Sequence, residues 1–209
     1  MRRSAGRREK FKPVVAALLC LAPLSPAAHA FQAQHGSLTV TYVDPQDRQQ
    51  LGAVYRAWDA AARDLKALGL SPPAKVRIEA AGNAADFQAR TGEPVNIAAS
   101  TQGAVIRTQR LSALAARGLL SNTVRHEAFH TAQPAGIPRW LAEGLARTFS
   151  GEGKSDPRTP TGLEDLPDLR LNTELLGRDP ARLNAAYREA TVRAAKLVRA
   201  RGWKEALRW

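Results

Sequence analysis

Two histidines and a glutamate in the stretch HEAFH, residues 126–130, have the spacing of a zinc site. Each residue of an α-helix turns about 100° around the axis, so His126 and His130 project from one face, one turn apart. Their imidazoles can reach one ion at the roughly 2.0–2.1 Å of zinc–nitrogen bonds. Glu127 lies beside the metal, where it can take a proton from zinc-bound water and return it to a leaving amine. The pattern predicts zinc-dependent hydrolysis, and the competing interpretation is two surface histidines on an amphipathic helix.

A catalytic zinc ion needs three protein ligands and an open position. No histidine follows His130, so the third ligand must be an oxygen or the distant His35. Two prolines and a glycine in TAQPAGIPRW end the first helix, allow a tight reversal and begin a second helix. That second helix carries Glu143, which the reversal can bring back against the first helix. We therefore expect Glu143 as the third ligand, the alternative being a glutamate favoured near a helix N-terminus by the helix dipole.

From HEAFH to IPRWLAEGLA, the sequence resembles the peptidase MA-like group of gluzincin zinc metallopeptidases. In that group an HExxH helix precedes a helix with W-x-x-E-G, whose glutamate is the third zinc ligand. The matching residues in this chain are His126, Glu127, His130, Trp140, Glu143 and Gly144. A weaker similarity extends through residues 179–207. The resemblance implies a zincin-like domain with Zn²⁺ as cofactor and a peptide or protein as substrate.

The resemblance also implies roles for residues outside the motif. Thermolysin-like relatives hold a zinc histidine with an aspartate four residues after the ligand glutamate, but that position is Arg147 here, so the partner must differ. Gluzincins commonly stabilise the oxyanion with a tyrosine or histidine of the C-terminal helices. Tyr187 is the candidate; the alternatives are that it is a core aromatic, and that His35 takes the role. The relatives pair an extended peptide with an edge strand, and residues 103–109 are either that strand or a covered interior one.

Hydrophobic periodicity predicts the elements that must position these residues. Strands are expected at residues 37–43, 75–80, 96–100 and 103–109. Helices are expected at residues 45–68, 83–90, 111–118, 120–133, 138–149 and 180–201. Residues 150–168, rich in Gly, Pro and charge, form a loop that is either a functional cover or a disordered span. The order predicts an α+β fold: a zincin-like single domain with a small mixed sheet in the N-terminal half, then the active-site helix and a helical C-terminal half.

Residues 1–30 have the pattern of a secretory signal peptide, with a basic start, an eleven-residue apolar run and a small-residue exit ending at Ala30. A membrane-spanning helix needs about 20 apolar residues, so this run is too short to be one. We expect cleavage after Ala30, a gluzincin-like metallopeptidase domain at residues 31–209, secretion or periplasmic localisation, and no stable membrane span after cleavage.

The composition of residues 31–209 narrows the classes of function. The single cysteine, Cys20, precedes this range, so disulfides and thiolate chemistry are excluded. The whole chain carries a formal net charge of +12, and residues 31–209 keep 25 basic against 18 acidic residues, or +7. The basic residues are scattered and lack a series of base-stacking aromatics, which favours a solubility role over an anionic partner, and we expect no nucleic-acid binding.

Two functional hypotheses follow. The first is a secreted zinc metallopeptidase that hydrolyses peptide bonds, with zinc on His126, His130 and Glu143 and with Glu127 as general base. The alternative is a non-catalytic periplasmic binding or scaffold protein that retains a zincin-like fold. Glu127 favours the first hypothesis, because a protein kept only for its fold needs no proton shuttle beside the metal.

Overall fold

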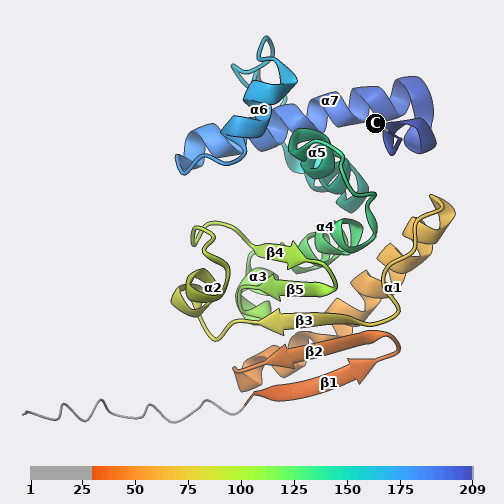
Figure 1. The fold of residues 1–209 in the computed structure, drawn as a ribbon. Coiled ribbons are helices and arrows are strands. Elements are labelled where there is room, and N and C mark those ends of the chain that lie inside the picture. The colour runs from red at the N-terminus through yellow and green to blue at the C-terminus, as the bar shows by residue number, and fades with distance from the viewer. Residues whose placement is uncertain (1–29, 209) are drawn as a thin grey trace, which may run out of the picture.

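The computed structural model describes residues 30–208 and has an α+β fold (Figure 1). A five-stranded sheet occupies the N-terminal half, and helices make up the C-terminal half, which confirms the predicted fold class. The predicted signal peptide falls on residues 1–29, outside the described residues. Between residues 30 and 208, no helix is both long enough and apolar enough to cross a membrane.

The sheet is mixed, with strand order β1-β2-β3-β5-β4. Its strands are β1 (Phe31–His35), β2 (Leu38–Tyr42), β3 (Val76–Ala80), β4 (Ala99–Gln102) and β5 (Val105–Thr108). The inner strands β2, β3 and β5 run parallel, and the two outer strands pair with them antiparallel. Alternation in LTVTY buries every second residue of β2, as the sequence predicted. Strand β1 was not predicted, because FQAQH is mostly exposed and has only two apolar residues, Phe31 and Ala33, too few for a clear alternation.

The helices are η1 (Pro45–Gln50), α1 (Leu51–Ala67), α2 (Ala84–Thr91), α3 (Leu111–Ala116), α4 (Leu120–Ala132), α5 (Arg139–Ser150), η2 (Glu152–Ser155), α6 (Asp168–Glu174) and α7 (Pro180–Ala206). All but η2 and α6 lie where the sequence predicted helices. Asn83 and Asp179 cap α2 and α7 by accepting hydrogen bonds from backbone N–H groups of the first turn. Gly202, with φ 77°, interrupts α7 where the sequence predicted a break.

Helix α4 is held between the sheet and the C-terminal helices. It packs against α1 and β4 on one side and α5 on the other, and α5 in turn packs against α7 (Figure 1). Fully buried Ala128 and Phe129 of α4 and Leu141 and Leu145 of α5 belong to one continuous core with the sheet. Because α4 and α5 are fixed by this core, the polar residues they turn toward each other have defined positions.

Gly144 permits the close contact between α5 and α7. A Cβ atom at this position would lie 2.7 Å from the Ala194 Cβ and the Ala190 carbonyl carbon, and closer still to the carbonyl oxygen of Ala190. Real Cβ atoms essentially never approach other atoms so closely, so any larger residue would push α7 away. The glycine of WLAEG therefore has a packing role, next to the carboxylate of Glu143.

The loop after α5 is ordered along α7 by arginines. Arg188 donates to the carbonyl oxygen of Pro157 over 2.9 Å. Arg193 donates to Asp168 Oδ1 over 2.7 Å and to the carbonyl oxygen of Leu163 over 3.1 Å. These contacts argue against the disordered span that was one interpretation of residues 150–168, and the functional cover stays a prediction.

Candidate metal centre

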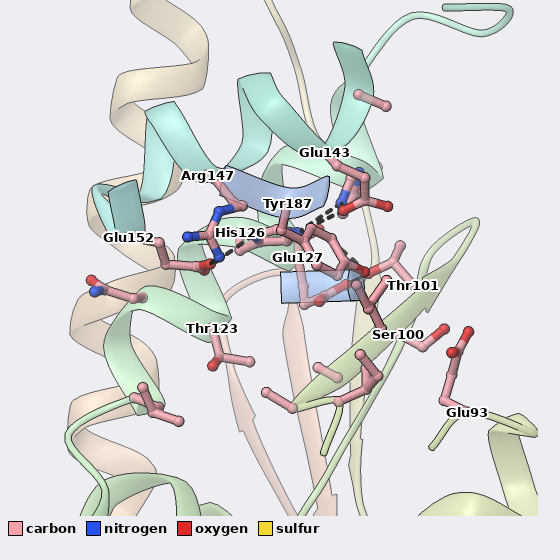
Figure 2. Close-up of a pocket in the computed structure, with 18 of the residues that line it drawn as sticks. Glu93, Ser100, Thr101, Thr123, His126, Glu127, Glu143, Arg147, Glu152 and Tyr187 are labelled. Atoms are coloured by element: carbon pink, nitrogen blue, oxygen red, sulfur yellow. Dashed lines mark hydrogen bonds and ion pairs between the residues drawn. The ribbon is translucent and has the colours of Figure 1, made fainter. Parts of the chain in front are cut away.

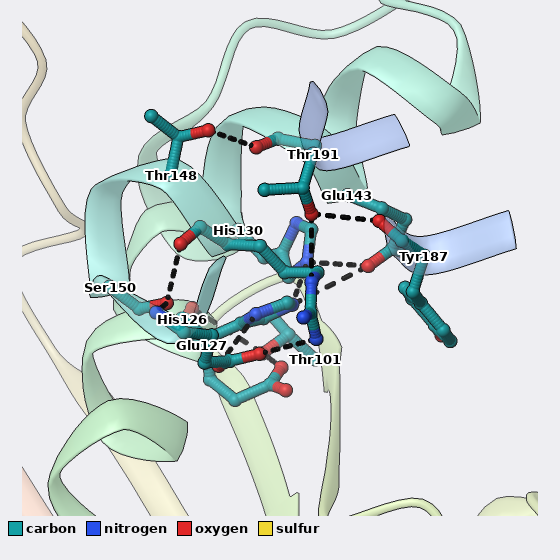
Figure 3. Close-up of polar contacts among 12 residues, drawn as sticks. Thr101, His126, Glu127, His130, Glu143, Thr148, Ser150, Tyr187 and Thr191 are labelled. Atoms are coloured by element: carbon teal, nitrogen blue, oxygen red, sulfur yellow. Dashed lines mark hydrogen bonds and ion pairs between the residues drawn. The ribbon is translucent and has the colours of Figure 1, made fainter. Parts of the chain in front are cut away.

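The two histidines and Glu143 converge at the interface of α4 and α5. His126 Nε2 lies 3.0 Å from His130 Nε2. Glu143 Oε2 lies 3.4 Å from the first of these nitrogens and 3.5 Å from the second. Figure 3 shows the glutamate of α5 facing both imidazoles of α4. The structure thus brings together the three residues that the sequence predicted as ligands.

The reversal between the helices forms as the prolines and glycine predict. Helix α4 ends before Gln133, whose backbone is extended, with φ −63° and ψ 149°. Gly136 then adopts φ 83°, a left-handed conformation that favours glycine, and Pro138 precedes the first residue of α5. The side-chain oxygen of Asn172 in α6 accepts a hydrogen bond of 2.7 Å from the backbone N–H of Trp140. This contact satisfies one of the backbone N–H groups at the start of α5 that have no partner within the helix.

This ligand set fits a zinc ion. Tetrahedral bonds of 2.0–2.2 Å place ligand atoms about 3.3–3.6 Å apart, and the three separations here are 3.0, 3.4 and 3.5 Å. The other ring nitrogens are already engaged. His126 Nδ1 lies 3.1 Å from Glu152 Oε1, and His130 Nδ1 lies 2.9 Å from Gln133 Oε1. With both Nδ1–H groups donating to these oxygens, both Nε2 lone pairs are free to face a metal.

The electrostatics of the cluster favour a cation. Burial lowers the pKa of His126, but Glu152 and Glu143 outweigh it and hold that pKa well above its ordinary value. Burial likewise opposes Glu143 ionisation, yet the two histidines keep the pKa of its carboxyl well below the ordinary range. The pKa of His130 is also raised, with burial opposing and Glu143 favouring the charged form. The carboxylates thus favour a positive charge on the two imidazoles, and a bound metal ion would place its positive charge at the same position.

Glu127 lies next to these residues, and one of its carboxylate oxygens accepts a hydrogen bond from β4. Its side chain is buried, and Thr101 Oγ1 of β4 donates a hydrogen bond of 2.6 Å to Glu127 Oε2 (Figure 3). Glu127 Oε1 is then left to accept a proton from a molecule in the adjoining cleft. The contact between β4 and α4 thus positions the predicted general base.

A cleft of about 960 Å³ opens beside these residues (Figure 2). It is lined by β4, α4, α5, η2 and α7. Residues 103–109 contain β5, which lies inside the sheet between β3 and β4. The interpretation of this stretch as an edge strand is therefore wrong, and the alternative of an interior strand is confirmed. The outer strand at the cleft is β4, Ala99–Gln102, which is antiparallel to β5. The edge of β4 that does not pair with β5 therefore faces the candidate metal centre.

Tyr187 and His35 lie in different parts of the molecule. Tyr187 reaches the cleft from α7 and is only partly buried, so it is not simply a core aromatic. Burial first, and then the Glu143 carboxylate, raise the pKa of the Tyr187 hydroxyl above its ordinary value. His35 is in β1, at the opposite edge of the sheet, with Nε2 2.9 Å from Asp59 Oδ2. His35 therefore joins neither the ligand set nor the cleft.

Sequence reasoning missed three residues that orient the predicted ones: Thr101, Gln133 and Glu152. The sequence indicated only that such a residue was needed. Arg147 stands where the thermolysin-like proteins have an aspartate, so another residue had to accept the hydrogen bond of the zinc-binding histidine. No protein-family model matches the chain, and no curated protein matches it. The resemblance to gluzincins thus continues to rest on the residues of the motif itself.

Proposed function

We propose that this protein is a secreted zinc-dependent metallopeptidase of the gluzincin type, which hydrolyses peptide bonds. One observation carries the proposal. The Nε2 atoms of His126 and His130 and a carboxylate oxygen of Glu143 converge within 3.5 Å of one another. They do so in the same cleft as the Glu127 carboxylate. This combination of three ligand atoms and an adjacent proton acceptor is what a hydrolytic zinc site requires.

The residues of the chain have separate tasks in the reaction. When bound, zinc supplies Lewis acidity, which polarises a carbonyl group and makes a water molecule more acidic. Glu127 accepts a proton from the attacking water on its free Oε1 and then passes it to the leaving amine, while Thr101 keeps Oε2 in place. Tyr187, whose hydroxyl is protonated at neutral pH, donates a hydrogen bond to the oxyanion that forms at the scissile carbonyl.

An extended peptide is the substrate that suits the cleft. The outer edge of β4 can pair with a strand through backbone hydrogen bonds, which bind a peptide without regard to its side chains. The same strand carries Thr101, so pairing aligns the peptide with the residue that holds the general base. Arg117 and Arg139 also line the cleft and give it positive charge for side-chain selection.

The test is hydrolysis of a mixed peptide library by the wild type and by Glu127→Gln, with zinc content measured in both. Glu127→Gln preserves the shape of the side chain and removes its basicity, so we expect bound zinc and a loss of activity of at least about 100-fold. Bound zinc without hydrolysis by the wild type would support the non-catalytic alternative. A wild type that is folded and binds no zinc would overturn the site.

A further inference from the structure

Arg147 creates an electrostatic problem for the candidate metal centre. It stands four residues after Glu143, on the same face of α5, where the thermolysin-like relatives carry an aspartate for a zinc histidine. A guanidinium has five N–H donors and no acceptor, so it cannot accept a hydrogen bond from an imidazole N–H. His126 therefore needs an acceptor from another part of the chain.

Glu152 of η2 supplies that acceptor. Its two oxygens bridge the histidine and the arginine, with Oε1 3.1 Å from His126 Nδ1 and Oε2 3.0 Å from an Arg147 Nη atom. Figure 2 shows the Glu152 side chain directed at both partners. The site thus contains a carboxylate on the imidazole, as in the relatives, although the carboxylate comes from the next element.

Arg147 is fixed tightly enough to act as an anchor for this carboxylate. Its Nε donates to Thr191 Oγ1 of α7 over 2.9 Å. Its second terminal nitrogen donates to both oxygens of Asp156, over 2.7 and 2.9 Å. A planar guanidinium bonded on three sides has one orientation, and in it the remaining N–H groups face Glu152.

We propose that Glu152 positions His126 for metal binding and that Arg147 holds Glu152 in this role; the inference rests on the proposed zinc site. A carboxylate on Nδ1–H fixes the imidazole with Nε2 toward the metal and makes that nitrogen a stronger ligand. Among residues 30–208, the partner of His130 Nδ1 is the neutral amide of Gln133, so within this range a carboxylate acts in this way on His126 alone. The turn that follows α5 is therefore part of the metal centre.

The test measures zinc affinity of the full chain by competition with a fluorescent zinc chelator. Glu152→Gln and Glu152→Ala should weaken zinc binding by about 10- to 100-fold, with the larger loss for alanine. Arg147→Met should also weaken it, and the double variant Arg147→Met/Glu152→Ala should lose no more than Glu152→Ala alone, because both changes break one contact. Glu93→Gln, which removes another carboxylate from the same cleft, should bind zinc like the wild type.

A second readout separates positioning from general loss of charge or structure. In the zinc-loaded wild type, proton NMR should show a downfield, slowly exchanging Nδ1–H signal from His126, which Glu152→Ala should remove. Circular dichroism checks that each variant is folded, and the Glu152 variants test the inference even where Arg147→Met unfolds.

The outcomes distinguish this inference from the proposed function. Zinc binding by the wild type with unchanged affinity in both Glu152 variants overturns the positioning role and leaves the metallopeptidase standing. An equal loss in Glu93→Gln also overturns it, because the effect is then one of charge. A folded wild type that binds no zinc overturns both.

Discussion

Replacing Gly144 by alanine tests whether the close packing of α5 on α7 supports the candidate metal centre. The added Cβ would lie 2.7 Å from two atoms of α7, where ordinary contacts are 3.4–4 Å, so the helices must separate by about 1 Å. One of these atoms is the backbone carbonyl carbon of Ala190, and no side-chain rotation can relieve that contact. Overpacking of a core costs about 1–3 kcal/mol, and a clash with backbone belongs at the upper end of that range.

Gly52→Ala is the matched control. Gly52 lies in α1, and a Cβ there would meet only the flexible end of Arg56 at 3.4 Å. Alanine is favoured over glycine in a helix by about 1 kcal/mol, so this variant should be slightly more stable than the wild type. The two variants make the same chemical change and should shift stability in opposite directions.

Thermal unfolding followed by circular dichroism measures the difference. Gly144→Ala gains the same helix propensity, so its net cost is about 2 kcal/mol. At roughly 2–4 °C per kcal/mol for a chain of this size, Gly144→Ala should lower Tm by about 4–8 °C, while Gly52→Ala should raise it by a few degrees. Because Gly144 is adjacent to Glu143, the first variant should also bind zinc more weakly. A Tm for Gly144→Ala equal to or above that of the wild type would refute the packing argument.

Three further predictions concern separate parts of the molecule. Asp47 is buried and accepts hydrogen bonds from two backbone N–H groups at the start of α3, so Asp47→Ala should lower the free energy of unfolding in urea by about 2–4 kcal/mol. The control Asp59→Ala breaks the half-exposed pair with His35 and should lower it by less than about 1 kcal/mol. Equal losses in the two variants would contradict this. Arg193→Ala should speed native-state proteolysis within residues 156–168, because it releases three contacts to that segment, and a rate no faster than that of Arg208→Ala would count against the tether. Tyr187→Phe should reduce kcat by roughly 10²–10³ with unchanged zinc content, and an unchanged kcat would remove the hydroxyl from the mechanism.

The sequence predicted the fold wherever one face of an element is consistently apolar. The alternation of β2 and the stripe of α5, with Trp140, Leu141 and Leu145, are signals of burial that local periodicity carries. Strand β1 and helix α6 were not predicted, because neither has a consistently apolar face. FQAQH is held by pairing to β2, and the seven-residue α6 buries only Leu171 among its own residues, so tertiary contacts rather than local pattern stabilise them.

The candidate site divides in the same way. His126, His130 and Glu143 could be predicted because helix geometry and a short reversal place them together. The partners Thr101 and Glu152 could not, since a contact between β4 and α4 depends on strand order, and the contact to Glu152 depends on how the chain turns after α5. The wrong edge-strand prediction has the same origin, because only pairing decides which of two adjacent strands lies outside.

Anomalous X-ray diffraction at the zinc absorption edge tests the central claim most directly. Crystals grown with zinc should give one strong peak at 2.0–2.2 Å from His126 Nε2, His130 Nε2 and a carboxylate oxygen of Glu143. The Glu127 carboxylate should lie beside the peak and outside bonding distance of it. A peak bound by other residues, or no peak in crystals of the folded protein, would contradict the assignment of a zinc-dependent peptidase.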